Sequence, residues 1–148
     1  MAMGACFWLM LAAGFAGGCS KAPKCAGDDE NTGIIFSSIQ MGCEPTTLQD
    51  HYVIATDSAY QQTFSDSSNG QTRCALPPID FNTYTLLGAR ASGQCEIKVL
   101  RAVTRVDAQS QYLYKITVKS CGLCKKLAYA DNWVLVPKLP SGWAVTFD

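Results

Sequence analysis

The amino-acid sequence predicts an all-β protein: one antiparallel domain, a sandwich or an open barrel, with one short helix. Apolar and polar residues alternate along 112–118, which is the period of a half-buried strand. About six or seven strand-like runs follow one another with turn residues between them, a spacing typical of sandwiches and barrels. Helical spacing stands out in one short segment, near residues 58–64.

The composition is that of a compact folded protein. Of the 148 residues, 48% are hydrophobic and 16% are charged, which is enough apolar material for a core of ordinary size. The formal net charge is zero, which argues against nucleic acid as a partner. The charges are unevenly spread, because acids dominate residues 1–89 and lysines and arginines dominate residues 90–138.

The N-terminus has the pattern of a secretory signal. Residues 1–18 carry no charge and run from large apolar to small residues, as a signal segment does before its cleavage site. Cys19 follows Ala16-Gly17-Gly18, and this run resembles the lipobox of bacterial lipoproteins. That resemblance implies acylation of Cys19, export, and a lipid anchor in a membrane of the bacterial cell envelope.

Two alternatives stay open for this segment. No Lys or Arg precedes the apolar run, although signal segments usually begin with one. Eighteen apolar residues are also just long enough to span a bilayer, so the segment can be an uncleaved anchor. The second alternative is a chance resemblance.

Residues 19–33 follow as a polar tether without periodicity, and residues 34–148 form the β-rich domain. Within the domain, 34–41 is the first expected strand and 51–55 the second. Ser58 with Gln61 makes a capping-box signature, and Tyr60 and Phe64 then share one face of a short helix.

The centre of the domain is an expected hairpin. A strand at 84–89 comes first, and Ser92-Gly93 is expected to turn the chain into the hairpin. Its two arms, 97–103 and 112–118, are joined by the polar turn Asp107–Ser110. Two further strands follow, at 133–136 and toward the C-terminus, where Trp143, Val145 and Phe147 alternate with other residues.

Eight cysteines raise the question of disulfides. Cys6 lies in the signal segment and Cys19 is the lipid site; the remaining cysteines are Cys25, Cys43, Cys74, Cys95, Cys121 and Cys124. An even number in an exported chain favours disulfide bonds. If Asp107 pairs with Ser110, Cys95 lies opposite Gly122, so both Cys121 and Cys124 are within its reach. We expect Cys43 to pair with Cys74, and Cys25 with whichever of Cys121 and Cys124 remains.

The run Cys121-Gly122-Leu123-Cys124 resembles the redox motif of thioredoxins, which makes a thiol-disulfide oxidoreductase the main alternative function. In those enzymes a helix follows the motif and its dipole lowers the thiol pKa. Here residues 125–131 leave too little chain for that helix before the next strand. Structural disulfides are therefore favoured over redox chemistry and over a zinc site, and we expect no cofactor and no metal.

Lysines gather on the outward phase of the hairpin and just beyond it. A face formed by Lys115, Lys119, Lys125 and Lys126 would attract anionic lipid headgroups or acidic glycans. The simpler interpretation is that these lysines keep an exposed sheet soluble and discourage edge pairing.

The second half of the chain resembles a group of small bacterial envelope lipoproteins. It is similar, more distantly, to the C-terminal domain of PrcB-type protease-complex proteins. The matching residues are Ile79, Asp80, Phe81, Leu86, Leu87, Gly88, Gly93, Cys95, Ile97, Trp133, Pro137, Lys138, Leu139 and Pro140. The resemblance implies a β-rich exported domain and brings no catalytic residue. We therefore expect a non-enzymatic binding or structural module at the envelope, with an envelope protein among its expected partners; a protease-associated or protease-inhibitor-like module is the third possibility.

Overall fold

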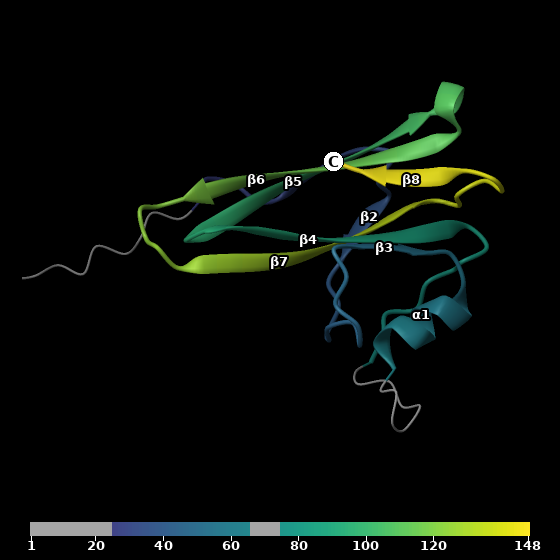
Figure 1. Ribbon diagram of the computed structural model, residues 1–148, viewed down its shortest axis with the longest axis horizontal. Helices are drawn as coiled ribbons and strands as arrows, with labels where there is room; N and C mark the ends of the chain where they lie inside the picture. Colours follow the sequence, from purple (N-terminus) through teal and green to yellow (C-terminus); the bar gives the residue numbers. More distant parts are fainter. Residues whose placement is uncertain (1–24, 66–74) are drawn as a thin grey trace, which may run out of the picture.

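A computed structural model describes residues 25–65 and 75–148, which form two packed β-sheets and one α-helix (Figure 1). The predictions for residues 1–18 and for Cys19 lie outside the described residues. The elements are β1 Glu30–Gly33, β2 Ser37–Ile39, β3 His51–Ile54, α1 Asp57–Phe64, β4 Tyr84–Gln94, β5 Glu96–Val106, the 3-10 turn Asp107–Gln109, β6 Gln111–Cys121, β7 Leu127–Pro137 and β8 Ala144–Phe147.

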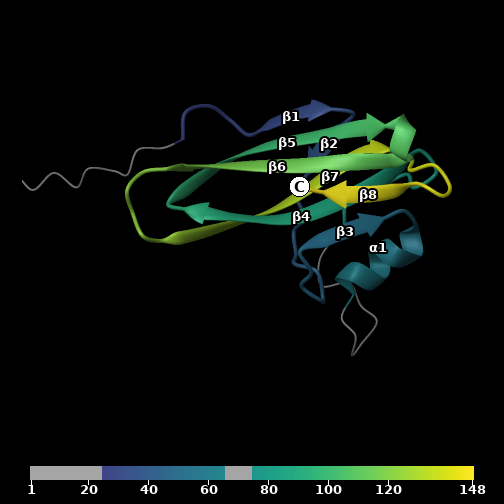
Figure 2. The ribbon, with the colours of Figure 1, turned by 45° about the horizontal axis from the view of Figure 1, so that its top comes forward.

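Each sheet has four strands. The first sheet has the order β1-β5-β6-β8 and the second has the order β2-β7-β4-β3 (Figure 2). Along one edge of the sandwich, the ring of His51 in β3 stacks on that of Phe147 in β8 with 4.3 Å between centroids. The all-β, sandwich-like class predicted from the sequence is confirmed. In the described part of the chain, no helix is long and apolar enough to cross a membrane.

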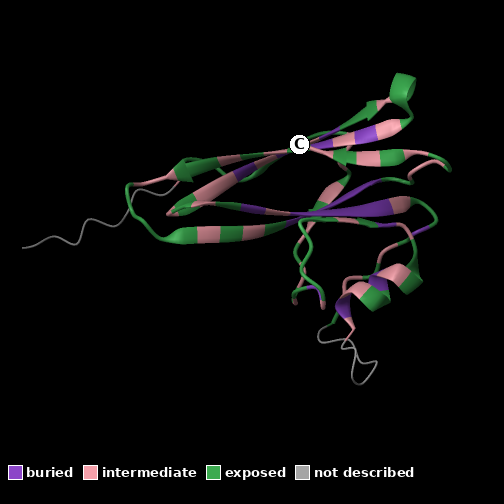
Figure 3. Ribbon diagram, viewed as in Figure 1, coloured by how far each residue is buried: buried purple, intermediate pink, exposed green. Residues whose placement is uncertain are grey.

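The molecule has three layers, with α1 on the outer face of the second sheet (Figure 1). One core lies between the sheets, where Val103, Tyr112 and Tyr114 face Leu87 and Val134. A second core lies between the second sheet and α1; it contains Ile54, Tyr60, Phe64, Phe81, Leu86, Trp133 and Leu135. The buried stretches of β4 and β7 belong to the half of the sandwich that carries the helix (Figure 3). Both faces of these strands are buried there, which explains why their sequences are mostly apolar without alternation.

The central hairpin has the register that its turn predicts. β5 pairs with β6 from Glu96 opposite Cys121 to Val106 opposite Gln111. Residues on the predicted inward phase, such as Val99 and Tyr112, are buried. Because a shift of one residue would turn this apolar set toward water, the alternation specifies the register.

The chain turns into the hairpin at a different place from the one predicted. Ser92 and Gly93 lie inside β4, which continues to Gln94 beside β7. The turn is at Cys95, which has a φ of 65° and takes the chain from the second sheet to the first. Gly93 serves close packing instead, because a Cβ there would lie 2.6 Å from Cγ2 of Ile97.

The boundary between tether and domain also differs from the prediction. Residues 25–33 belong to the folded domain, since β1 lies parallel to β5 with Glu30 opposite Leu100. The expected strand at 34–41 is shorter: β2 begins at Ser37, after a turn at Gly33 with a φ of 76°. Every residue of β1 is exposed, so this edge strand has no apolar pattern that would reveal it.

The short helix is where the sequence predicts it, with Tyr60 and Phe64 buried. Its N-cap is Thr56 rather than Ser58: Oγ1 of Thr56 accepts a hydrogen bond from the backbone N–H of Ala59 at 3.2 Å. Thr56 has extended backbone angles, which a capping residue requires, whereas Ser58 is already helical.

Candidate functional site: the disulfide end of the sandwich

Two chain corners meet at one end of the sandwich. The β4–β5 corner is at Cys95, and the β6–β7 corner is the loop 122–126. Cys95 forms a disulfide with Cys124, with 5.3 Å between the Cα atoms. The backbone N–H of Cys95 also donates to the carbonyl oxygen of Lys126 at 2.8 Å. We call Cys25, Cys95 and residues 121–127 the disulfide end.

A second disulfide brings the start of the described chain to this end. Cys25 is bonded to Cys121 with 5.2 Å between the Cα atoms, across 96 positions of sequence. In the chain-entropy model, closing a loop of that size raises the free energy of the unfolded chain by about 4.7 kcal/mol. Closing the shorter Cys95–Cys124 loop raises it by about 3.6 kcal/mol. The two bonds thus fix both chain corners at this end to the rest of the domain.

The observed pairing resolves the alternatives that the sequence left open. Cys95 pairs with Cys124, and Cys121 pairs with Cys25. Cys43 also takes part in a disulfide. Its predicted partner Cys74 lies outside the described residues, so the Cys43–Cys74 pair stays a prediction.

The CxxC run has a cross-linking geometry. Cys121 and Cys124 are bonded to two different cysteines and not to each other. A redox CxxC cycles between a dithiol and a disulfide formed by its own two sulfurs, with a helix following it. Here β7 begins at Leu127, directly after the loop. Among the described residues, no group of His, Cys, Asp or Glu has the arrangement of a metal site.

The surface of the disulfide end combines apolar and basic side chains. Leu123 is fully exposed, at 102% of its reference area, and Leu127 is 50% exposed. Lys125 and Lys126 lie between them and are exposed. Exposed segments dominate this end of the sandwich (Figure 3).

The four lysines of the predicted face do not lie together in the structure. Lys115 lies in the middle of β6 and forms an ion pair with the carboxylate of Asp148 at 2.9 Å. Lys119 lies close to the disulfide end, near Glu30, whose carboxylate pairs with Lys98 at 2.7 Å. The hydrogen bond from Lys98 and its charge lower the pKa of Glu30 below its ordinary value. Lys125 and Lys126, by contrast, have no ion pair with any carboxylate of the described residues.

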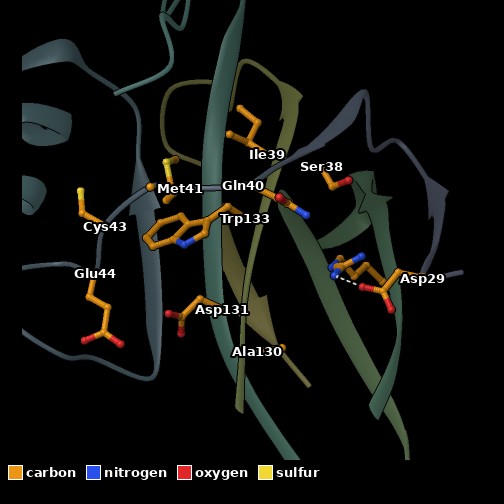
Figure 4. Close-up of a pocket in the computed structure, with 12 residues that line it drawn as sticks. Asp29, Ser38, Ile39, Gln40, Met41, Cys43, Glu44, Ala130, Asp131 and Trp133 are labelled. Atoms are coloured by element: carbon orange, nitrogen blue, oxygen red, sulfur yellow. Dashed lines mark hydrogen bonds and ion pairs between the residues drawn. The ribbon is translucent and has the colours of Figure 1, made fainter. Parts of the chain in front are cut away.

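A separate cleft of about 560 Å³ lies between β2, β7 and the Asp29–Arg101 pair (Figure 4). Arg101 interrupts the apolar phase of β5 and is 8% exposed. Its guanidinium donates to Asp29 at 2.6 Å, to Asn132 at 2.8 Å and to Asn31 at 3.3 Å. Each guanidinium nitrogen donates one of these bonds, so Arg101 ties the segment before β1 to both sheets.

Asp29 is the charged partner of this buried guanidinium. Burial opposes its ionisation, but the N–H of Val99, donating at 2.8 Å, and the guanidinium of Arg101 outweigh that effect and lower the pKa of Asp29. The sequence signal for Arg101 was its place in an otherwise apolar strand face. No comparable signal marks Asp29, which lies in the polar segment before β1.

Comparisons with protein-family models, with curated proteins and with solved structures find no match to this chain.

Proposed function

We propose that this protein is an exported lipoprotein, acylated at Cys19, whose β-rich domain is a binding or structural module at the bacterial cell envelope. The uncharged run 1–18 and the lipobox-like Ala16-Gly17-Gly18-Cys19 support the anchor. Two disulfides in the described chain support an oxidising compartment, since such bonds persist mainly in exported proteins.

The observation that carries the proposal is the Cys25–Cys121 bond. Cys25 follows the proposed lipid site Cys19 after a few residues, and the disulfide holds it against the end of β6. A chain of that length reaches at most about 20 Å. A lipid on Cys19 would thus hold the domain at the membrane by its disulfide end, without the long tether that the sequence suggested.

Labelling with a fatty acid tests this proposal. The full chain is expressed in a bacterium that processes lipoproteins, and the membrane fraction is examined for incorporated label and for the mass of the mature protein. We expect the wild type to carry label and to begin at Cys19, and Cys19→Ala to carry none and to leave the membrane fraction.

Cys25→Ala combined with Cys121→Ala is the matched control, because it removes cysteines that form a disulfide and leaves the lipobox intact. This double variant should keep the label. An unlabelled wild-type protein that retains residues 1–18 would refute the proposal and identify the segment as an uncleaved anchor.

A further inference from the structure

We propose that the loop at the disulfide end docks onto an anionic phospholipid surface, with Leu123 entering the interface and Lys125 and Lys126 contacting the headgroups. This inference rests on the proposed lipid anchor at Cys19 and names the surface that the anchored domain meets. We call Leu123, Lys125, Lys126 and Leu127 the docking tip.

The docking tip is cross-linked to the rest of the domain at two points. Leu123 lies between Cys121 and Cys124, and each of these is cross-linked to a different part of the domain. Both cysteines that bracket Leu123 are thus held in place, and Leu123 is fully exposed. Single exposed leucines are ordinary, but here two more large apolar side chains at the start of β7, Leu127 and Tyr129, are 50% and 64% exposed.

The position of the tip relative to the proposed anchor favours a bilayer as its occupant. Cys121 is bonded to Cys25, so the described chain begins beside the tip. The few residues between Cys19 and Cys25 reach at most about 20 Å, which places any membrane that holds Cys19 within reach of Leu123. Apolar side chains close to lysines suit the boundary between headgroups and acyl chains, as the two faces of interfacial helices do.

The charges of the tip complement an anionic surface. Lys125 and Lys126 are exposed and have no ion pair within the described residues, so their charges are free to attract lipid headgroups. Lys119 adds a third positive charge near the same end. Lys115 is not part of the tip, because it lies farther along β6 and pairs with Asp148.

Fluorescence quenching by brominated lipids tests the docking. The mature lipidated protein carrying Leu123→Trp is reconstituted into vesicles of phosphatidylcholine with phosphatidylglycerol, brominated on the acyl chains. Ala108→Trp is the matched control, because Ala108 is an exposed residue of the 3-10 turn at the opposite end of β6. The parent protein provides the background from Trp133 and Trp143.

We expect quenching at position 123 to be several-fold greater than at position 108. Changing both Lys125 and Lys126 to Glu, or using phosphatidylcholine alone, should reduce it to the level of the control. Equal quenching at the two positions, in protein that stays on the vesicles, would overturn the docking proposal while leaving the lipid anchor intact.

Two further outcomes are distinguishable. Protein that does not float with the vesicles at all would mean that the anchor proposed at Cys19 is absent. Strong retention on an acidic polysaccharide that depends on Lys125 and Lys126, without quenching in anionic vesicles, would overturn the lipid assignment in favour of a glycan.

Discussion

The indole ring of Trp133 lies directly over the backbone of Gly88 on the neighbouring strand. The two residues are opposite each other in the β4–β7 pairing. A Cβ on Gly88 would overlap the six-membered ring of Trp133. Because Gly88 has no side chain, Trp133 can lie flat on the sheet, where it is 3% exposed and packs against Tyr52 and Phe64.

Replacing Gly88 with Ala should therefore lower the free energy of unfolding by about 2 kcal/mol, the usual cost of overpacking a core. Urea denaturation measures this cost in two backgrounds, the wild type and Trp133→Leu. We expect the cost of Gly88→Ala to be much smaller when the indole is absent. An equal cost in both backgrounds would show that the effect is not the overlap with Trp133.

The hydroxyl of Tyr114 is buried and has no hydrogen-bond partner among the described residues. Its burial raises the pKa of the phenol. Tyr114→Phe should leave stability unchanged or raise it by about 1 kcal/mol, since it removes an unsatisfied buried group. Tyr60→Phe is the comparison, because the Tyr60 hydroxyl donates to the carbonyl of Pro77 at 3.1 Å. That variant should lose about 1 kcal/mol, and a larger loss in Tyr114→Phe would contradict this account.

The residue that caps the N-terminus of α1 is Thr56, whereas the sequence predicted Ser58. Thr56→Ala removes the side-chain oxygen that accepts from Ala59 and should cost about 1 kcal/mol in thermal or urea unfolding. Ser58→Ala, inside the first turn, should change stability by less than about 0.5 kcal/mol. A larger loss of stability in Ser58→Ala than in Thr56→Ala would mean that Ser58 is the capping residue.

The hairpin could be predicted from sequence because its information is local. The turn Asp107–Ser110 and the alternating residues on both sides specify one register, and the structure has that register. The extent of β4 and β7 was underestimated. The halves of these strands nearest the disulfide end contain small or polar residues such as Ser92, Gly93 and Ala128, which have little strand propensity. They are strands because β4 and β7 pair with each other there.

The contacts of the N-terminal segment could not be predicted, because they join residues far apart in the chain. Arg101 is visible in the sequence as a break in the apolar phase of its strand, but its partner Asp29 lies in a polar segment. The choice between Cys121 and Cys124 as the partner of Cys95 depended on the shape of the 122–126 loop. The positive φ of Gly122 and Cys95 sets that shape.

The free energy of unfolding should depend on pH through the Asp29–Arg101 pair. The pKa of Asp29 is lowered in the folded protein, so its ionised form stabilises the fold above the ordinary value of 3.8. This contribution is lost as the pH falls through the lower folded pKa. Asp29→Asn should therefore be less stable than wild type near neutral pH, and the gap should narrow toward about pH 2.

Urea unfolding between about pH 2 and about pH 6 measures this gap. The control is Asp50→Asn, since Asp50 is exposed and its carboxylate forms no ion pair with a described residue. A gap between wild type and Asp29→Asn that stays constant over this range would mean that the ionised carboxylate contributes nothing specific.

Mass spectrometry of the non-reduced mature protein tests the central claim most directly, because it reads the N-terminus and the cross-links together. Cys121 and Cys124 fall in one tryptic peptide, so the protein must also be cleaved after Leu123, for example with chymotrypsin. The account predicts an acylated Cys19 at the N-terminus, Cys25 linked to Cys121, and Cys95 linked to Cys124. A Cys121–Cys124 bond, with Cys25 and Cys95 as free thiols and Cys19 unmodified, would contradict it and favour the oxidoreductase alternative.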